Sequence, residues 1–258
     1  MNPPALKMVA FDFDGVIADT EKAHFEMFRL ALLEEGIEFT WSQYCEKYLG
    51  YTDLECIQHV LIDRDRLNPP LPTTESPEAN PDIQRIFQSK KTKYAAYIAE
   101  NSLLLPGVRD LLDDLRKNRI VAAICSGALT EEIEFILEKE QIHPYFTFIV
   151  AAEDVSLGKP DPEGYRLCLQ RLNEQLPSNT HPGPLDSCPD PADPPRPVQP
   201  TECIVIEDSL WGIQAAHAAG MKCLALTTSY PADQLSPADR IVADLSQVNT
   251  DLLREMIA

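Results

Sequence analysis

The amino-acid sequence predicts an α/β protein with a doubly wound parallel sheet and an inserted all-helical domain. From Leu105 onward, short apolar runs alternate with segments of helical periodicity, which is the pattern of a parallel sheet covered by helices. Between residues 20 and 102 the apolar residues follow helical spacing and no strong strand pattern occurs. We therefore expect an α/β core of residues 1–19 and 103–258 and a helical domain of residues 20–102.

The first predicted strand begins at Met8 and ends in two carboxylates, Asp12 and Asp14, before Gly15 breaks the apolar run. Buried acids are costly unless they have partners or a function. In an open parallel sheet, ligands lie beyond the carboxyl ends of the strands, where these acids would emerge. An isolated pair is equally consistent with an ordinary Asp-Gly turn, so the later strand ends must decide between the two readings.

Helical spacing predicts the elements of the inserted domain. Thr20 can cap a helix that continues until Gly36. Further helices are expected at residues 41–49, 53–62 and 82–98. Residues 68–81 are rich in proline, threonine and glutamate, which predicts an exposed loop.

The remaining chain supplies the alternation of strands and helices. Strands are expected at residues 120–125, 146–151, 203–206, 221–227 and 241–242, and helices at residues 106–116, 130–140, 163–174, 210–219 and 250–257. Residues 177–200 are crowded with proline and show no periodicity. We expect a surface insertion there, because this composition buries too little apolar area to offset the entropy of ordering.

The charge balance disfavours polyanionic partners. Lys plus Arg is 22 against 41 for Asp plus Glu, a formal net charge of -19. Long-range repulsion therefore argues against nucleic acid and anionic membranes. A small anionic substrate remains possible, since a divalent cation and a few lysines can invert the field inside one pocket.

The cysteine pattern and the absence of targeting segments predict a cytoplasmic protein. The 7 cysteines show no Cys-x-x-Cys spacing, which favours reduced thiols over a disulfide framework or a zinc site. No secretory signal pattern and no apolar run long enough for a membrane span occur in the sequence.

Polar side chains recur at the ends of the predicted strands. If these ends converge at one sheet edge, several carboxylates share a pocket with one hydroxyl and one ammonium group. Close carboxylates repel one another unless a cation lies among them, and a ligand set made only of oxygens suits Mg²⁺. The residues of this set are Asp12, Asp14, Ser126, Lys159, Glu207 and Asp208.

This set resembles the four motifs of the haloacid dehalogenase superfamily of phosphatases and phosphotransferases, whose core is Rossmann-like. Residues 12–17 are similar to the first motif, Ser126 to the second, Lys159 to the third and Glu207-Asp208 to the fourth. The motifs occur in the family's order and cover nearly the whole chain. The resemblance implies that Asp12 is the nucleophile that forms an aspartyl-phosphate.

The resemblance also implies roles for the other motif residues. Asp14 would protonate the leaving oxygen and then accept a proton from water. Ser126, Gly127 and Lys159 would bind the phosphoryl group. The implied Mg²⁺ ligands are the Asp12 carboxylate, the Asp14 carbonyl, Asp208, and Glu207 directly or through water. Dehalogenases of the superfamily lack an acid at the Asp14 position, so phosphoryl chemistry is preferred.

The helical insertion resembles the cap domain of the branch that contains β-phosphoglucomutase and the CbbY-like sugar-phosphate phosphatases. Thr20 and His24 match cap positions that face the active site in that branch, and residues 49–53, with Gly50 and Thr52, resemble its specificity loop. The chain departs from the mutase at Asp53, where an arginine would hold a second phosphate. An acid there favours hydrolysis over mutase cycling.

The roles of several side chains have alternative interpretations. Lys91 is a candidate for a cation that compensates Asp53, and a solvated basic face formed with Lys90 and Lys93 is an equal alternative. His24 could bridge Asp14 to the cap or lie on a surface helix. Trp211 is expected to pack on the sheet and Ser209 to cap the helix that follows it.

These expectations together predict a Mg²⁺-dependent phosphatase that hydrolyses a small phosphorylated metabolite, and the expected class is a sugar phosphate. The alternative is a β-phosphoglucomutase-like phosphomutase, and a third reading is a non-catalytic binding or regulatory member of the fold. The expected partner is a small phosphorylated molecule, with no nucleic acid and no membrane. The protein itself is expected to be a monomer or a weak homo-oligomer.

Overall fold

The computed structural model describes residues 5–48, 51–67, 80–175 and 196–258, and within them the core is a six-stranded sheet of order β3-β2-β1-β4-β5-β6. All neighbouring strands run parallel, which confirms the predicted doubly wound sheet. The strands are β1 (Met8–Phe11), β2 (Val121–Cys125), β3 (Phe146–Val150), β4 (Cys203–Glu207), β5 (Lys222–Leu226) and β6 (Arg240–Val242).

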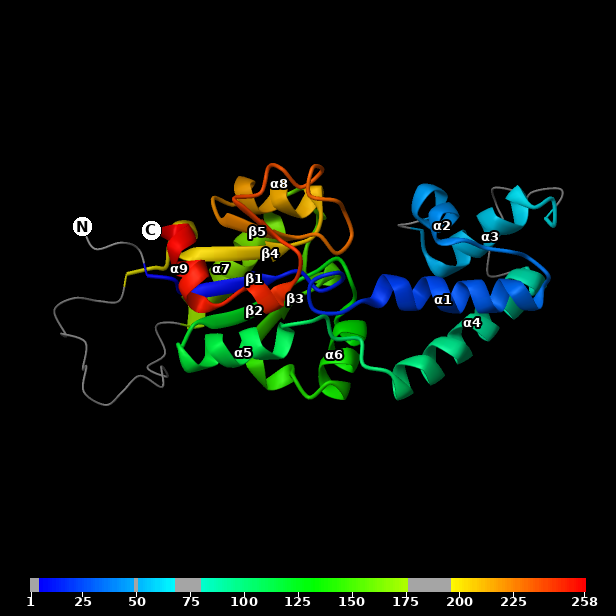
Figure 1. The fold of residues 1–258 in the computed structure, drawn as a ribbon, viewed down its shortest axis with the longest axis horizontal. Coiled ribbons are helices and arrows are strands. Elements are labelled where there is room, and N and C mark those ends of the chain that lie inside the picture. Colours follow the sequence, from blue (N-terminus) through cyan, green and yellow to red (C-terminus); the bar gives the residue numbers. More distant parts are fainter. Residues whose placement is uncertain (1–4, 49–50, 68–79, 176–195) are drawn as a thin grey trace. The chain divides into compact units, whose positions relative to one another are not determined.

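Strand β1 lies in the middle of the sheet, between β2 and β4 (Figure 1). Its residues are each 0% exposed, as is typical of a parallel strand covered on both faces. Phe11 pairs with Ile124 of β2 and with Ile206 of β4, so these three strands end at the same level. The residues that follow them therefore lie along one edge of the sheet.

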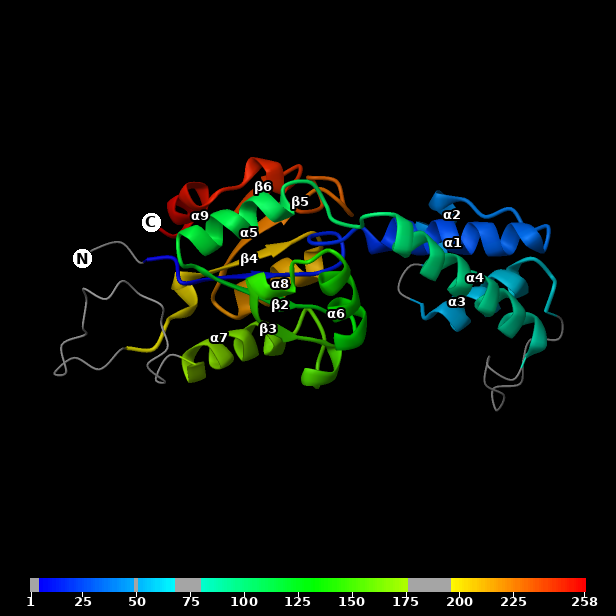
Figure 2. The same cartoon turned by 90° about the horizontal axis from the view of Figure 1, so that it is seen from below.

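Helices cover both faces of the sheet (Figure 2). Two of them, α5 and α9, lie on one face, whereas α7 and α8 pack on the other through a shared apolar cluster with the strands. The helices of the core are α5 (Val108–Lys117), α6 (Thr130–Lys139), α7 (Glu163–Gln175), α8 (Leu210–Ala218) and α9 (Thr250–Ile257).

Helix α8 buries small residues against the sheet and leaves its aromatic residue outside. Gly212, Ala215 and Ala216 are buried, and they let the helix axis approach β4 and β5 closely. Trp211 is 55% exposed. The prediction that Trp211 packs on the sheet is therefore wrong, because the small residues occupy the face that meets the strands.

Residues Thr20–Leu103 form a second compact unit, separate from the unit of Met1–Asp19 and Leu104–Ala258. Its apolar cluster joins aromatic residues of its first half with aliphatic residues of its second half. Side-chain caps at Thr40, Thr52 and Asn80 fix the starts of its last three helices. The helices are α1 (Thr20–Glu34), α2 (Trp41–Lys47), α3 (Asp53–Asp63) and α4 (Pro81–Glu100).

The two ends of this insertion meet inside the core unit. Ala18 forms an isolated antiparallel bridge with Leu104, and the Leu105 N–H donates to the Ile17 carbonyl at 3.0 Å. The predicted exposed loop lies outside the described residues except for its last two positions, and so does the predicted surface insertion up to residue 195. None of the helices in the described segments is long and apolar enough to cross a bilayer.

Candidate active site

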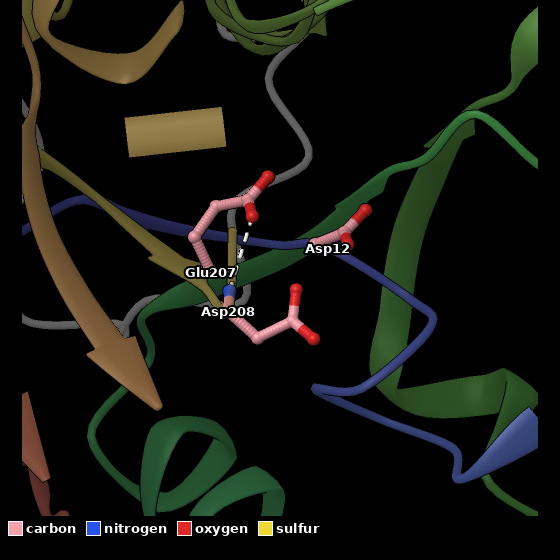
Figure 3. A group of neighbouring side chains, drawn as sticks. All are labelled: Asp12, Glu207 and Asp208. Atoms are coloured by element: carbon pink, nitrogen blue, oxygen red, sulfur yellow. Dashed lines mark hydrogen bonds between the residues drawn. The ribbon is translucent and has the colours of Figure 1, made fainter. Parts of the chain in front are cut away.

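Three carboxylates meet at the carboxyl edge of the sheet (Figure 3). Asp12 follows β1 directly, Glu207 is the last residue of β4, and Asp208 comes after it. One oxygen atom from each lies within 4.8 Å of the others, and all three residues are buried. The common level at which β1 and β4 end brings these acids together, as the sequence predicted.

Lys159 joins two of these carboxylates. Its ammonium donates to Asp12 Oδ1 at 2.6 Å and to Glu207 Oε1 at 2.6 Å. Burial disfavours the charged amine, but attraction by Asp12 and Glu207 outweighs it and raises the pKa of Lys159 well above its usual value. Lys159 is therefore a fixed cation between the two acids.

Glu207 is 0% exposed and its carboxylate is surrounded by donors. Oε1 accepts from Lys159 and from the Tyr165 hydroxyl at 2.8 Å, while Oε2 accepts from the Ser209 hydroxyl at 3.0 Å and from the backbone N–H groups of Asp208 and Ser209. Burial alone would raise the pKa of Glu207, but Lys159 and these hydrogen bonds lower it. Glu207 is thus an ionised anchor for Lys159.

A glycine makes room for this anchor. A Cβ atom on Gly212 of α8 would lie 1.8 Å from Oε1 of Glu207. Ser209 caps the same helix by accepting from the Gly212 N–H at 3.1 Å, as predicted, and it also donates to Glu207. The start of α8 is therefore shaped around the Glu207 side chain.

The donor set suits a hard divalent cation. Burial raises the pKa of Asp12 well above its ordinary value despite the opposing effect of Lys159, and the charge of Glu207 raises it further. Burial, followed by the charge of Glu207, raises the pKa of Asp208 to about 7. Such crowding is relieved when a cation binds, and a set made only of carboxylate oxygens fits Mg²⁺.

Two hydroxyl residues that the sequence analysis did not single out, Ser229 and Thr228, fix Asp208 and the neighbouring Gly15 turn. The hydroxyl of Ser229 donates to Asp208 Oδ2, and the hydroxyl of Thr228 donates to the Gly15 carbonyl. Gly15 has φ of 74°, and a Cβ there would lie 1.8 Å from Asp208 Oδ2. Both hydroxyls come shortly after strand β5, so the strand-end rule used for the acids could have found them.

The remaining predicted residues of the core lie at the same edge. Asp14 is partly buried in the turn after Asp12, where its backbone bridges to Ala18, and its charge contributes to the raised pKa of Asp208. Ser126 directly follows β2, is 6% exposed and accepts from the Ala128 N–H at 3.0 Å. Gly127 follows it, and a Cβ atom added to this glycine would lie more than 4 Å from every atom outside the glycine and its two chain neighbours.

The residues predicted in the helical unit are placed by its own helices. Thr20 is the buried first residue of α1, and His24 lies about one turn further along the same helix. Thr52 caps α3 by accepting from the Glu55 N–H at 3.4 Å. Gly50 lies outside the described residues.

The cation beside Asp53 is Lys90, not Lys91. Lys90 of α4 is 1% exposed, and its ammonium donates to Asp53 Oδ2 at 2.5 Å. Lys91 is exposed, and Lys93 donates to Glu34 at 2.6 Å. The alternative of a solvated basic face is therefore wrong for Lys90, because this side chain lies on the buried side of α4.

Comparisons with known proteins find that the chain is similar to enzymes that act on phosphate esters. The sequence model of the haloacid dehalogenase-like hydrolases matches residues 9–226. The chain is 30% identical to the fructose-1-phosphate phosphatase YqaB of Escherichia coli, over 82% of this chain and 91% of the relative. It is 28% identical to a phosphorylated carbohydrates phosphatase of Thermotoga maritima, over 84% of this chain and 83% of the relative. The crystal structure of a putative beta-phosphoglucomutase from Thermotoga maritima superposes with a TM-score of 0.69 at 26% identity, covering 97% of this chain and 99% of the other.

Proposed function

The chain belongs to the haloacid dehalogenase-like hydrolase family, in its phosphatase and phosphomutase branch, and from this premise we propose a Mg²⁺-dependent phosphatase that hydrolyses a small sugar phosphate through an aspartyl-phosphate. The observation that carries the proposal is the contact of Lys159 with Asp12, beside Asp208 and the anchored Glu207. A carboxylate nucleophile, a fixed cation and a place for a metal are the parts that phosphoryl transfer needs.

Asp12 is the proposed nucleophile. Lys159 holds its Oδ1 at 2.6 Å, which orients the carboxylate and leaves Oδ2 as the oxygen that we assign to attack on phosphorus. The attack forms a bond between Oδ2 and phosphorus, and the bond from phosphorus to the leaving oxygen breaks. Water then attacks the aspartyl-phosphate and regenerates Asp12.

Asp14 is the proposed proton carrier. It gives a proton to the leaving oxygen in the first step and takes one from the attacking water in the second. Its place in the turn after Asp12 supports this role, since both acids come from one short segment. Ser126, Gly127 and Lys159 are proposed to bind the phosphoryl oxygens through a hydroxyl, a backbone N–H and the ammonium group.

The proposed Mg²⁺ ligands are the carboxylates of Asp12 and Asp208 and the backbone carbonyl of Asp14. When bound, Mg²⁺ offsets the repulsion between the phosphate and the Asp12 carboxylate. Glu207 already accepts hydrogen bonds at both oxygens, so we assign it to anchoring Lys159 and to reaching the metal through water. The hydrogen bond from the Ser229 hydroxyl orients the Asp208 carboxylate for this proposed role as a metal ligand.

The proposed substrate is a sugar phosphate. The names of two relatives support it, a fructose-1-phosphate phosphatase and a phosphorylated carbohydrates phosphatase. In the helical unit, Thr20, His24, Gly50 and Thr52 stay the candidates for contact with the sugar, as the resemblance to the family's cap domain implies.

A phosphomutase is the second candidate. The structural likeness to a putative beta-phosphoglucomutase favours it, and Lys90 weakens the electrostatic argument that Asp53 alone would make against it. The two functions differ in the fate of the phosphoryl group, which water removes in a phosphatase and a second sugar hydroxyl accepts in a mutase.

A screen of phosphorylated sugars for release of inorganic phosphate tests the proposal. We expect Mg²⁺-dependent release that the Asp12→Asn variant lacks. Isomerisation of a sugar phosphate, primed by its bisphosphate and without phosphate release, would support the mutase instead. Absence of both reactions, together with failure to hydrolyse para-nitrophenyl phosphate, would point to the non-catalytic reading.

A further inference from the structure

Three consecutive residues in the first turn of α7 make contacts around Lys159. The helix begins at Glu163, shortly after Lys159 in the chain, and Gly164 and Tyr165 follow. Each of the three reaches a different part of the core unit outside the helix. The proposed phosphate-binding ammonium group is therefore followed closely by residues that can fix its position.

Glu163 closes the short backbone segment that carries Lys159. Its Oε2 atom accepts from the Ser156 N–H at 3.0 Å and from the Leu157 N–H at 2.8 Å. Hydrogen bonds to an ionised carboxylate are stronger than those between neutral groups. Since Ser156 and Leu157 precede Lys159 and Glu163 follows it, these contacts hold the main chain from which the lysine side chain extends.

Tyr165 holds the other end of Lys159, its ammonium group. The Tyr165 hydroxyl donates to Oε1 of Glu207 at 2.8 Å, and the same oxygen accepts from Lys159 at 2.6 Å. The ammonium nitrogen also lies 5.3 Å from the centroid of the Tyr165 ring, where a cation is attracted to the aromatic face. Tyr165 is only 1% exposed, so packing fixes its ring and its hydroxyl.

Gly164 seats this turn against the sheet. A Cβ atom on Gly164 would lie 2.7 Å from Sγ of Cys125, the last residue of β2. A larger residue would push the start of α7 away from the strand, because protein interiors are closely packed. Ser126 directly follows this strand, so the same contact ties α7 to the strand end that carries the proposed phosphate-binding hydroxyl.

A lysine that orients another group needs support at both ends. Its charge lies at the tip of a flexible four-carbon stem, and holding that stem in one conformation costs entropy. Contacts already made in the folded protein meet this cost before a substrate binds, and reaction rates depend steeply on such placement. For packing alone a phenylalanine would serve at position 165, since a buried hydroxyl is costly unless it is hydrogen-bonded.

We propose that Glu163 and Tyr165 are positioning residues for phosphoryl transfer. Glu163 acts through the backbone of the segment that carries Lys159, and Tyr165 acts through Glu207 and through its own ring. The proposal rests on the proposed phosphatase function and deepens it, because it names residues that set the rate without touching the reacting atoms.

Tyr165→Phe removes the hydroxyl and keeps the ring. We expect kcat for para-nitrophenyl phosphate to fall about tenfold while KM stays within about threefold of native, since the lost contact orients Lys159 and does not bind the substrate. The dissociation constant of Mg²⁺ should not change. The matched control is Tyr145→Phe, which removes a hydroxyl that donates to Asp113 at 2.6 Å and should keep native kcat.

Glu163→Ala removes the acceptor of the two backbone N–H groups, and we expect kcat to fall about tenfold here too. Glu163→Gln keeps a side-chain oxygen that can accept from the same groups, so it should retain at least about half of the native kcat. Glu174→Ala changes an exposed acid at the other end of α7 and should behave as native. Thermal denaturation checks that each variant is folded.

Native kcat in Tyr165→Phe or in Glu163→Ala would overturn the proposal for that residue. A fall in kcat that comes with equally weakened Mg²⁺ binding, or a loss in Glu163→Ala that Glu163→Gln shares in full, would assign a merely structural role and overturn it as well. Failure of the native protein to hydrolyse para-nitrophenyl phosphate is a separate outcome, which would refute the phosphatase proposal and this one with it.

Discussion

The ammonium of Lys159 lies 2.6 Å from the Asp12 carboxylate, although the two residues are 147 positions apart in the chain. Asp12 follows the central strand, and Lys159 comes from the segment before α7. The same ammonium contacts Glu207, so one cation orients the proposed nucleophile and is itself held by a fully buried acid. The chemistry that we propose depends on this arrangement.

Replacing Asp12 by asparagine tests the nucleophile. The amide keeps the shape of the side chain but cannot form the acyl-phosphate, so we expect Mg²⁺-dependent hydrolysis of para-nitrophenyl phosphate to fall by at least about 1,000-fold. Asp233→Asn, at an exposed acid of the same unit, is the control and should keep native activity. Activity of Asp12→Asn within tenfold of native would exclude a covalent role for this residue.

Replacing Gly212 by alanine tests the anchor. Alanine normally favours a helix over glycine by about 0.5–1 kcal/mol, but here its Cβ would lie 1.8 Å from the Glu207 carboxylate. We expect the free energy of unfolding in urea to fall by about 1–3 kcal/mol and turnover to fall with it, because Glu207 and Lys159 must shift. At Gly158 no other atom lies within 4 Å of the place of a Cβ, so Gly158→Ala should leave both quantities near native. A stabilising effect of Gly212→Ala would contradict the tight approach.

Direct binding of Mg²⁺ tests the metal site. By isothermal titration calorimetry we expect a single Mg²⁺ to bind the native protein and to bind the Asp208→Asn variant far more weakly, since the variant removes one anionic ligand. Mg²⁺ at about 100 times its dissociation constant should also stabilise the native protein by about 2.7 kcal/mol, and addition of EDTA should reverse this gain. Equal Mg²⁺ affinity of the native protein and the Asp208→Asn variant would show that the ion does not bind at Asp208.

The low pKa of His24 predicts a pH dependence of stability. In the unfolded chain the pKa of His24 is that of an ordinary histidine, 6.5, whereas in the folded state, where the ring faces Lys90, Asp53 and Tyr94, the pKa is about 4. The unfolded state therefore binds the proton first as pH falls. The contribution of the neutral His24 ring to the free energy of unfolding is complete above pH 6.5 and is lost between pH 6.5 and pH 4. The total loss is on the order of 3 kcal/mol.

Urea unfolding at pH 6 and pH 5 measures this effect. The free energy of unfolding of the native protein should decrease more steeply than that of His24→Gln, by about 1.4 kcal/mol per pH unit. His143→Gln, at an exposed histidine of the core unit, provides the comparison for a general histidine effect. Parallel curves for the native protein and His24→Gln would show that the ring titrates alike in both states.

The sheet and its acidic edge could be predicted because their causes are local. Apolar runs specify the strands, and the predicted and observed ends of β2 to β6 differ by a single residue at most. A carboxylate directly after a buried strand can be recognised from the local sequence alone. The contact of Tyr165 with Glu207 depends on which strands and helices become neighbours, and a single sequence does not give that order.

The burial of Lys90 could have been predicted from the spacing of apolar residues on α4. Ile83, Ile86 and Lys90 follow helical spacing on α4, so the lysine lies on the apolar side of the helix. Its neighbours Lys91 and Lys93 suggested a charged surface instead. The helix phase, and not the run of lysines, decides which ammonium group is buried.

The bridge between Ala18 and Leu104 makes the inserted segment a natural module for exchange. The chain leaves the core and returns to it at adjacent points, next to the hydrogen bond between Leu105 and Ile17. A recombinant chimaera joined at these positions would cut neither a strand of the sheet nor a helix of either unit. Related segments can therefore be exchanged on a constant α/β core, which leaves the residues of the proposed active site unchanged.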